Sequence, residues 1–159
     1  MCVGIAIDAE LLSETFMKRF GLRRHVVGDM FGSPPEVRFA YNDPTPRLPI
    51  VTLDGAWDLP IWGNRDDQQS HLPPTGWVRE ESLQIGKWKH FEPEPVRIPA
   101  QRGLEKGVWF PIDSGIVGYV VRDEQGRPHV YMLTRAADDA YRLLTRHDRM
   151  PVWAHEYPF

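Results

Sequence analysis

Short runs of apolar, β-branched residues, separated by turn residues, extend along most of this chain and limit the folds that it can adopt. Runs of this length, bounded by Gly, Pro, Asn and Asp, are typical of strands joined by tight turns. The expected strands cover residues 3–7, 37–41, 50–53, 56–62, 96–98, 108–112, 116–121 and 129–133. The last two are separated by the turn 123–126 and predict a β-hairpin.

Helical periodicity appears in fewer places. Asp8 is expected to cap a helix in which Leu12, Phe16 and Phe20 recur every four residues before Gly21 ends the pattern. The other expected helices cover residues 79–85 and 136–144, and the expected loops cover residues 32–35 and 64–76. Many short strands with two or three helices predict one α+β domain over residues 1–159, built on a curled, barrel-like, mainly antiparallel sheet.

Composition and charge exclude several classes of protein. With 159 residues, 42% of them hydrophobic, the chain is long enough to bury a core, and its single cysteine excludes an internal disulfide. No apolar run approaches the roughly 18 residues of a membrane span, so we expect a cytoplasmic protein with no membrane partner. The net charge of −3 argues against a wholly electrostatic grip on DNA but leaves a local basic site open.

The single cysteine, Cys2, lies next to the initiator methionine. Removal of Met1 would leave one residue with a free α-amine, of pKa near ~8, and a thiol, of pKa near ~8.5. Both groups are then partly nucleophilic at neutral pH, and together they react with aldehydes. The alternative is that Cys2 is a small apolar residue of the core, which is the more common role of a lone intracellular cysteine.

Three further positions, Glu105 in mid-chain and His147 and Arg149 near the end, are candidates to lie together around Cys2. The stretch from His147 to Pro151 resembles the histidine motif of the SOS-response-associated peptidase family, whose members begin with Met-Cys and carry a glutamate in mid-chain. Further matches, in the family's order, are Tyr41-Asn42 with Pro44, Trp62-Gly63, Arg79 with Glu81, Ala100 with Glu105, and Thr134 with Ala136-Ala137. The chain departs from the family where Val3-Gly4 replaces Gly-Arg and where Trp77 replaces an asparagine.

The resemblance implies covalent capture of an abasic site in single-stranded DNA. The sugar aldehyde would form an imine with the Cys2 amine, and the Cys2 thiol would close a thiazolidine ring on the same carbon. In this scheme Glu105 takes a proton and His147 supplies one, as general base and general acid. The DNA-binding residues it implies are Asn42, Trp77, Arg79 and Arg149, and the protein would be nucleoid-associated when bound to DNA. No cofactor is implied.

Each of these residues also has a structural interpretation. His147 could cap the 136–144 helix, and Glu105 could be an exposed acid at a hairpin tip. Arg149 and Arg79 could pair with Asp148 and Glu81. Trp77 could stack on a base or block the pocket.

Two other functions stay open on the sequence. One is a catalytically degenerate relative that binds single-stranded DNA or a protein partner without crosslinking, and the other is a thiol autopeptidase that uses Cys2, Glu105 and His147. The histidines lack close ligand spacing and one cysteine cannot build a thiolate site, so we expect no metal. The sequence does not fix the oligomeric state.

Overall fold

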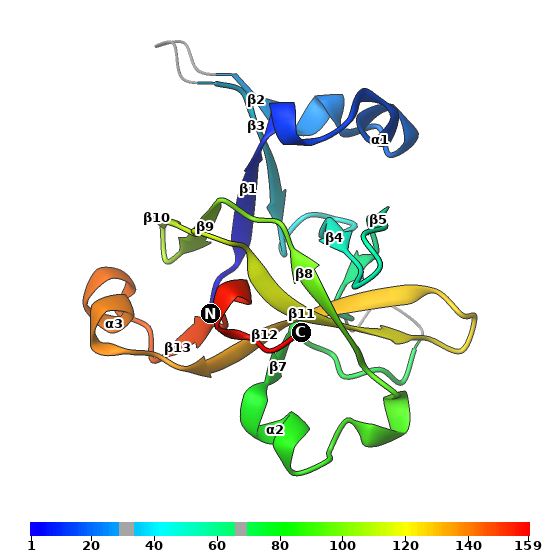
Figure 1. Cartoon of the computed structure of the whole chain (residues 1–159), viewed down its shortest axis with the longest axis vertical. Helices are drawn as coiled ribbons and strands as arrows, with labels where there is room; N and C mark the ends of the chain where they lie inside the picture. The colour runs from blue at the N-terminus through cyan, green and yellow to red at the C-terminus, as the bar shows by residue number, and fades with distance from the viewer. Residues whose placement is uncertain (29–33, 66–69) are drawn as a thin grey trace.

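The computed structural model describes residues 1–28, 34–65 and 70–159, and the expected loops over 32–35 and 64–76 fall partly outside them. Within these residues the chain forms a single α+β domain with two sheets (Figure 1). The first sheet, in the order β10-β9-β1-β3-β2, comprises β1 (Gly4–Asp8), β2 (Val26–Val27), β3 (Glu36–Ala40), β9 (Arg102–Glu105) and β10 (Val108–Pro111). All its pairings are antiparallel.

The second sheet follows the order β13-β12-β11-β8-β4-β5, and two more strands pair with β12. It comprises β4 (Ile50–Val51), β5 (Trp57–Asp58), β6 (Ile61–Trp62), β7 (Trp77–Arg79), β8 (Glu94–Ile98), β11 (Ile116–Arg122), β12 (Pro128–Ala136) and β13 (Arg149–Pro151). Only β6 and β7 are parallel to β12 among the pairings described. The predicted α+β class is therefore confirmed, although the sheets are open and do not close into a barrel.

Three α-helices and four 3-10 turns connect the described strands (Figure 1). They are α1 (Glu14–Arg19), α2 (Glu80–Gln84) and α3 (Asp139–Thr145), with η1 (Ala9–Leu11), η2 (Leu22–His25), η3 (Lys89–Phe91) and η4 (Ala154–Glu156). In Figure 1, α1 lies at one end of the molecule, beside β2 and β3, and α2 lies at the opposite end, below β7. No helix in the described part of the chain has the length and apolar character needed to cross a membrane.

The helix expected from Asp8 to Phe20 is divided in two. The Ser13 hydroxyl accepts a hydrogen bond from the Phe16 amide (3.1 Å) and starts α1 there, so residues 9–11 form only a 3-10 turn. The Asp8 carboxylate does not cap this turn, because it pairs with Arg102 at 3.1 Å. The sequence rule identified a helix start but selected the wrong capping residue.

The first strand, β1, lies in the middle of the first sheet and contributes side chains to the main apolar core. Alternate residues of β1, Ile5 and Ile7, pack in one apolar cluster with Val130 and Met132 of β12, so the two sheets share this core. The predicted β11–β12 hairpin is present, with Val120 opposite Val130. Because β12 also pairs with β6, β7 and β13, it connects most of the second sheet.

A buried ion-pair network closes this hairpin. The Asp123 carboxylate accepts from His129 Nε2 (2.9 Å) and Arg127 Nε (2.8 Å), and the other ring nitrogen of His129 faces the Gly63 carbonyl at 2.6 Å. Burial alone would raise the pKa of Asp123, but these hydrogen bonds outweigh it and hold the pKa well below its usual range. Only glycine fits at position 63, where the carbonyl meets His129, because its φ is +63° and a Cβ would lie 2.1 Å from the Thr75 carbonyl oxygen.

Acid is therefore expected to destabilise the protein through Asp123. A carboxyl whose folded pKa is depressed contributes stability above its unfolded pKa of about 4, and that contribution is lost as the pH falls towards the folded value. Asp123→Asn should reduce the free energy of unfolding at neutral pH by about 3 kcal/mol and flatten its dependence on pH below about 4. Urea unfolding, measured at a series of pH values from neutral to below about 4, reports both effects. Asp139→Asn, which changes a fully exposed carboxylate, is the control and should leave the wild-type slope unchanged.

Candidate active site at the amino terminus

Hydrogen bonds from three directions fix the amino terminus. The Val3 amide donates to the Leu104 carbonyl (2.8 Å) and the Tyr41 amide donates to the Val3 carbonyl (3.0 Å), so pairing with β9 and β3 continues beyond the end of β1. Trp77 Nε1 donates to the Cys2 carbonyl at 3.0 Å. The first residues are therefore held in the sheet.

Glu105 lies where β9 ends, and its side chain is only 3% exposed. One carboxylate oxygen, Oε2, is 2.8 Å from the terminal nitrogen of Met1, and Oε1 is 4.0 Å from His147 Nε2. Burial lowers the pKa of the Met1 amine, and the hydrogen bond and charge of Glu105 oppose this shift. A larger fraction of the amine is therefore in its neutral, nucleophilic form at a given pH than in an exposed chain end.

His147 reaches Glu105 because α3 ends two residues earlier, at Thr145. Arg146 takes a left-handed conformation (φ +59°) that terminates the helix, and the His147 amide then donates to the Thr145 hydroxyl at 3.3 Å. The Arg149 amide donates to Nδ1 of the ring (3.0 Å), which leaves Nε2 directed at Glu105. In addition, Lys106 Nζ donates to the Arg146 carbonyl at 3.0 Å and joins the β9–β10 turn to the end of α3.

The Cys2 thiol differs from the sequence-based expectation. The residue is completely buried, and Sγ donates to the Gly4 carbonyl at 3.1 Å. Burial raises the pKa of the thiol to about 12, and nearby backbone groups oppose this only in part. The ordinary thiol pKa near ~8.5 that the sequence suggested is therefore wrong for this state, in which the thiol is protonated at neutral pH.

Trp77 packs beside Cys2. Its ring lies 4.7 Å from that of Tyr41 and 6.0 Å from that of Trp62, measured between centroids, and Trp77 is half-buried. Two aromatic neighbours and the hydrogen bond to Cys2 hold the indole in place, so in this state it supports the amino terminus.

Two of the predicted DNA-binding residues, Arg79 and Arg149, lie beside the same residue, because Arg79 is paired with Thr134 in the sheet and Arg149 donates to Thr134. Arg149 is 13% exposed, pairs with Glu81 through both terminal nitrogens (3.2 and 3.0 Å) and donates to the Thr134 carbonyl at 2.9 Å. Arg79 is exposed at the end of β7, and Asn42 is exposed in the turn after β3. The structure thus brings Cys2, Glu105 and His147 together, but it directs the Arg149 guanidinium to Glu81.

Tyr141 on α3 lies near the site, and sequence reasoning did not identify it. It is buried, and the charges of Cys2 and Glu105 add to the effect of burial in raising its pKa. In sequence its only signal is that of an apolar helix position, which does not distinguish a site residue from the core.

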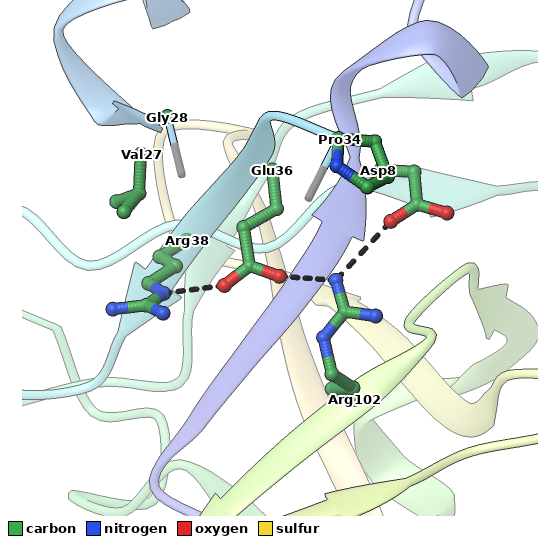
Figure 2. Close-up of a pocket in the computed structure, with 7 residues that line it drawn as sticks. All are labelled: Asp8, Val27, Gly28, Pro34, Glu36, Arg38 and Arg102. Carbon is green, nitrogen blue, oxygen red and sulfur yellow. Dashed lines mark hydrogen bonds and ion pairs between the residues drawn. The ribbon is translucent and has the colours of Figure 1, made fainter. Parts of the chain in front are cut away.

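A hollow in the described surface lies elsewhere, at the far end of β1 from Cys2 (Figure 2). Four charged side chains line it and already pair with one another: Arg38 with Glu36 (2.7 Å), Glu36 with Arg102, and Arg102 with Asp8 (3.1 Å). Because these charges compensate one another, the hollow has no excess charge to select a ligand. Within the described residues there is also no group of three or more His, Cys, Asp or Glu that could hold a metal ion.

Comparison with protein family models, with curated proteins and with solved structures gives no match for this chain. The family resemblance stays a prediction, and the function is argued from the geometry of the amino terminus.

Proposed function

We propose that this protein captures the aldehyde of an abasic site in single-stranded DNA as a covalent adduct with Cys2, after removal of Met1. The observation that carries the proposal is the terminal amine held 2.8 Å from the buried Glu105 carboxylate, with His147 on the other oxygen. An amine of lowered pKa, a carboxylate and an imidazole are the groups that imine formation requires. In the cell the protein would be cytoplasmic, and nucleoid-associated when bound to DNA.

The proposed reaction has two covalent steps. The Cys2 amine attacks the aldehyde carbon, and Glu105 takes one amine proton and passes it to the aldehyde oxygen. The resulting hydroxyl leaves as water with a second proton from His147, which gives a protonated imine. The thiol sulfur then bonds to the same carbon, and its proton is released as the imine becomes the ring amine. The net change is amine, thiol and aldehyde to thiazolidine and water.

Removal of Met1 is the step that creates the nucleophile. In the structure the amine beside Glu105 belongs to Met1, and the Cys2 nitrogen is an amide. One residue spans about 3.8 Å, so the new Cys2 amine would start within one residue length of the position that the Met1 amine now occupies beside this carboxylate. The buried thiol would act second, because a cationic imine on its own residue lowers its pKa towards neutrality.

A thiol autopeptidase is the second candidate function. The observation that favours it is that Glu105 binds the free amine of Met1, as an enzyme that removes an amino-terminal residue must do. In that case Cys2 would attack the Met1 carbonyl and release Met1 by hydrolysis of the thioester. The activity is compatible with aldehyde capture, because it generates the Cys2 amine.

A binding-only relative is the third candidate. It is favoured by the complete burial of Cys2 and by the hydrogen bond from Trp77 to its carbonyl. The experiment that separates it from aldehyde capture is incubation of protein that begins at Cys2 with single-stranded DNA containing one abasic site. Capture predicts a band that survives denaturing electrophoresis, and an oligonucleotide with the intact base should give none. A salt-sensitive complex without the covalent band would instead support the binding-only relative.

Binding of single-stranded DNA should weaken with salt, because phosphates release counterions when they meet protein cations. Exposed cations near the site include Lys106, Arg142 and Arg146. Arg146→Asn, which keeps a residue that tolerates the left-handed conformation, should weaken binding and reduce the slope of log K against log salt by about one unit. Arg23→Asn, the same charge change in η2, is the control and should change neither. A binding constant that does not change with salt would exclude nucleic acid as a partner.

A further inference from the structure

A second hollow of the described surface, of about 250 Å³, differs in charge from the one in Figure 2. The turn η2 contributes Arg24 and His25 to its lining, and the segment that follows β3 contributes Asp43 and Arg47. Among the described lining residues, two arginines and a histidine are therefore opposed by a single carboxylate. We call it the basic hollow. Its excess of positive charge favours an anionic ligand.

The two arginines of the basic hollow are not committed to acidic partners. Within residues 1–28, 34–65 and 70–159, neither Arg24 nor Arg47 forms an ion pair. Arg47 donates from one terminal nitrogen to the Leu59 carbonyl (3.0 Å), and the Asp43 carboxylate accepts from the Ala40 amide at 3.2 Å. Most N–H groups of the two guanidiniums are therefore available to a ligand. A guanidinium binds phosphate through paired, charge-assisted hydrogen bonds, which are roughly twice as strong as neutral ones.

Apolar side chains complete the lining of the basic hollow. Phe39, Leu22 and Leu59 are buried there. The His25 ring lies nearly parallel to that of Phe39, with 15° between the planes and 6.0 Å between the centroids. At about 250 Å³ the hollow is smaller than the roughly 300 Å³ or more of a site for a drug-sized ligand. It therefore suits a phosphate joined to a small organic group, such as the sugar of a nucleotide.

The basic hollow adjoins the same sheet as the amino terminus. Its Phe39 pairs with Ile5 of β1, and a strand rises about 3.3 Å per residue, so the hollow and Cys2 are separated by about 10 Å along β1. A few nucleotides of a DNA strand span this distance, because each adds about 3.4 Å even in the double helix. A strand bound at Cys2 is thus long enough to reach the hollow.

We propose that the basic hollow binds the phosphate group of one nucleotide, with Arg24 and Arg47 as its hydrogen-bond donors and the apolar lining against the sugar. The nucleotide is either a free mononucleotide or one unit of a DNA strand, since both present the same phosphate and sugar. The hollow takes no part in the chemistry of aldehyde capture. The inference therefore does not depend on the covalent step of the proposed function.

Titration of the full chain with deoxythymidine monophosphate, followed by calorimetry, tests this site. Arg24→Gln should weaken binding about tenfold or more, because it removes a charged hydrogen-bond donor. Arg23→Gln is the matched control and should leave the affinity unchanged, since it removes the same charge from the adjacent residue of η2, which is not among the residues that line the hollow. Thymidine, which lacks the phosphate, should bind at least tenfold more weakly than the nucleotide.

Asp43→Asn gives a result that damage to the fold would not produce. The substitution removes the single carboxylate among the described lining residues, and its side-chain oxygen can still accept from the Ala40 amide. The affinity for deoxythymidine monophosphate should therefore rise, by about fivefold, because one charge no longer repels the phosphate. An unchanged or lower affinity in the folded variant would contradict the placement of the phosphate in this hollow.

The other outcomes are equally decisive. The inference is wrong if the wild type does not bind the nucleotide, if thymidine binds as well, or if Arg24→Gln and Arg23→Gln behave alike. An oligothymidylate with intact bases distinguishes the two sources of the phosphate. Tighter binding than the mononucleotide, weakened by Arg24→Gln, would identify a DNA strand, and equal binding would identify a free nucleotide. Because none of these ligands carries an aldehyde, a failure here leaves aldehyde capture untouched, and a failure of adduct formation leaves this site untouched.

Discussion

Cys2→Ser is expected to abolish the stable adduct with abasic single-stranded DNA while leaving the amino group able to form an imine. Serine lacks the sulfur that closes the ring, so the product should remain a reversible imine. Borohydride added during the incubation should trap it as a permanent secondary amine, visible by denaturing electrophoresis. Without the reductant the band should be lost on heating.

The size of this effect follows from the chemistry of the ring. The thiazolidine holds the aldehyde carbon through nitrogen and sulfur, whereas water hydrolyses an imine readily. Since Cys2 is completely buried, serine also places a hydroxyl in the core, and an unfolding curve is needed to show that the variant is folded. A heat-stable adduct of folded Cys2→Ser would exclude the ring-closure step.

Glu105→Gln is expected to slow adduct formation about 100-fold or more, as general acid–base catalysis predicts for loss of its base. The expected shift of the amine pKa separates two possible causes of a slower reaction. Because the charge of Glu105 opposes the lowering of the Met1 amine pKa in the structure, we expect its removal to lower the pKa of the Cys2 amine that takes this place and to increase the fraction of neutral amine. A slower reaction would therefore report loss of the proton acceptor and not protonation of the nucleophile.

The control for Glu105→Gln is Glu36→Gln, which changes another ion-paired carboxylate of the same sheet at the far end of β1 (Figure 2). It should lower stability but leave the rate unchanged. Single-turnover kinetics with excess protein measure the covalent step for both variants. Equal rates for Glu105→Gln and the wild type would remove Glu105 from the mechanism.

The sequence predicted the parts of this structure that depend on local pattern. Apolar, β-branched runs separated by turn residues identified the β11–β12 hairpin, and the helix expected over 136–144 covers most of α3. The register and openness of the sheets could not be predicted, because they depend on how distant strands pair. The short strands β6 and β7, parallel to β12, are an example.

The candidate site was also predicted only in part from the sequence. Residue type and order selected Cys2, Glu105 and His147, and the structure places them together at the amino terminus. Burial and pairing are tertiary properties, and so the thiol pKa of about 12 and the pairing of Arg149 with Glu81 could not be read from the chain. The position of Tyr141 near these groups was missed for the same reason.

The most direct test of the central claim is the intact mass of untagged protein, measured alone and after incubation with single-stranded DNA that contains one abasic site. The account predicts that protein expressed in cells lacks Met1, and that incubation adds the mass of the oligonucleotide minus one water. The adduct should survive denaturation and should not form with protein that retains Met1, whose Cys2 nitrogen is an amide. Protein that begins at Cys2, remains folded and keeps its unmodified mass after incubation would contradict the account.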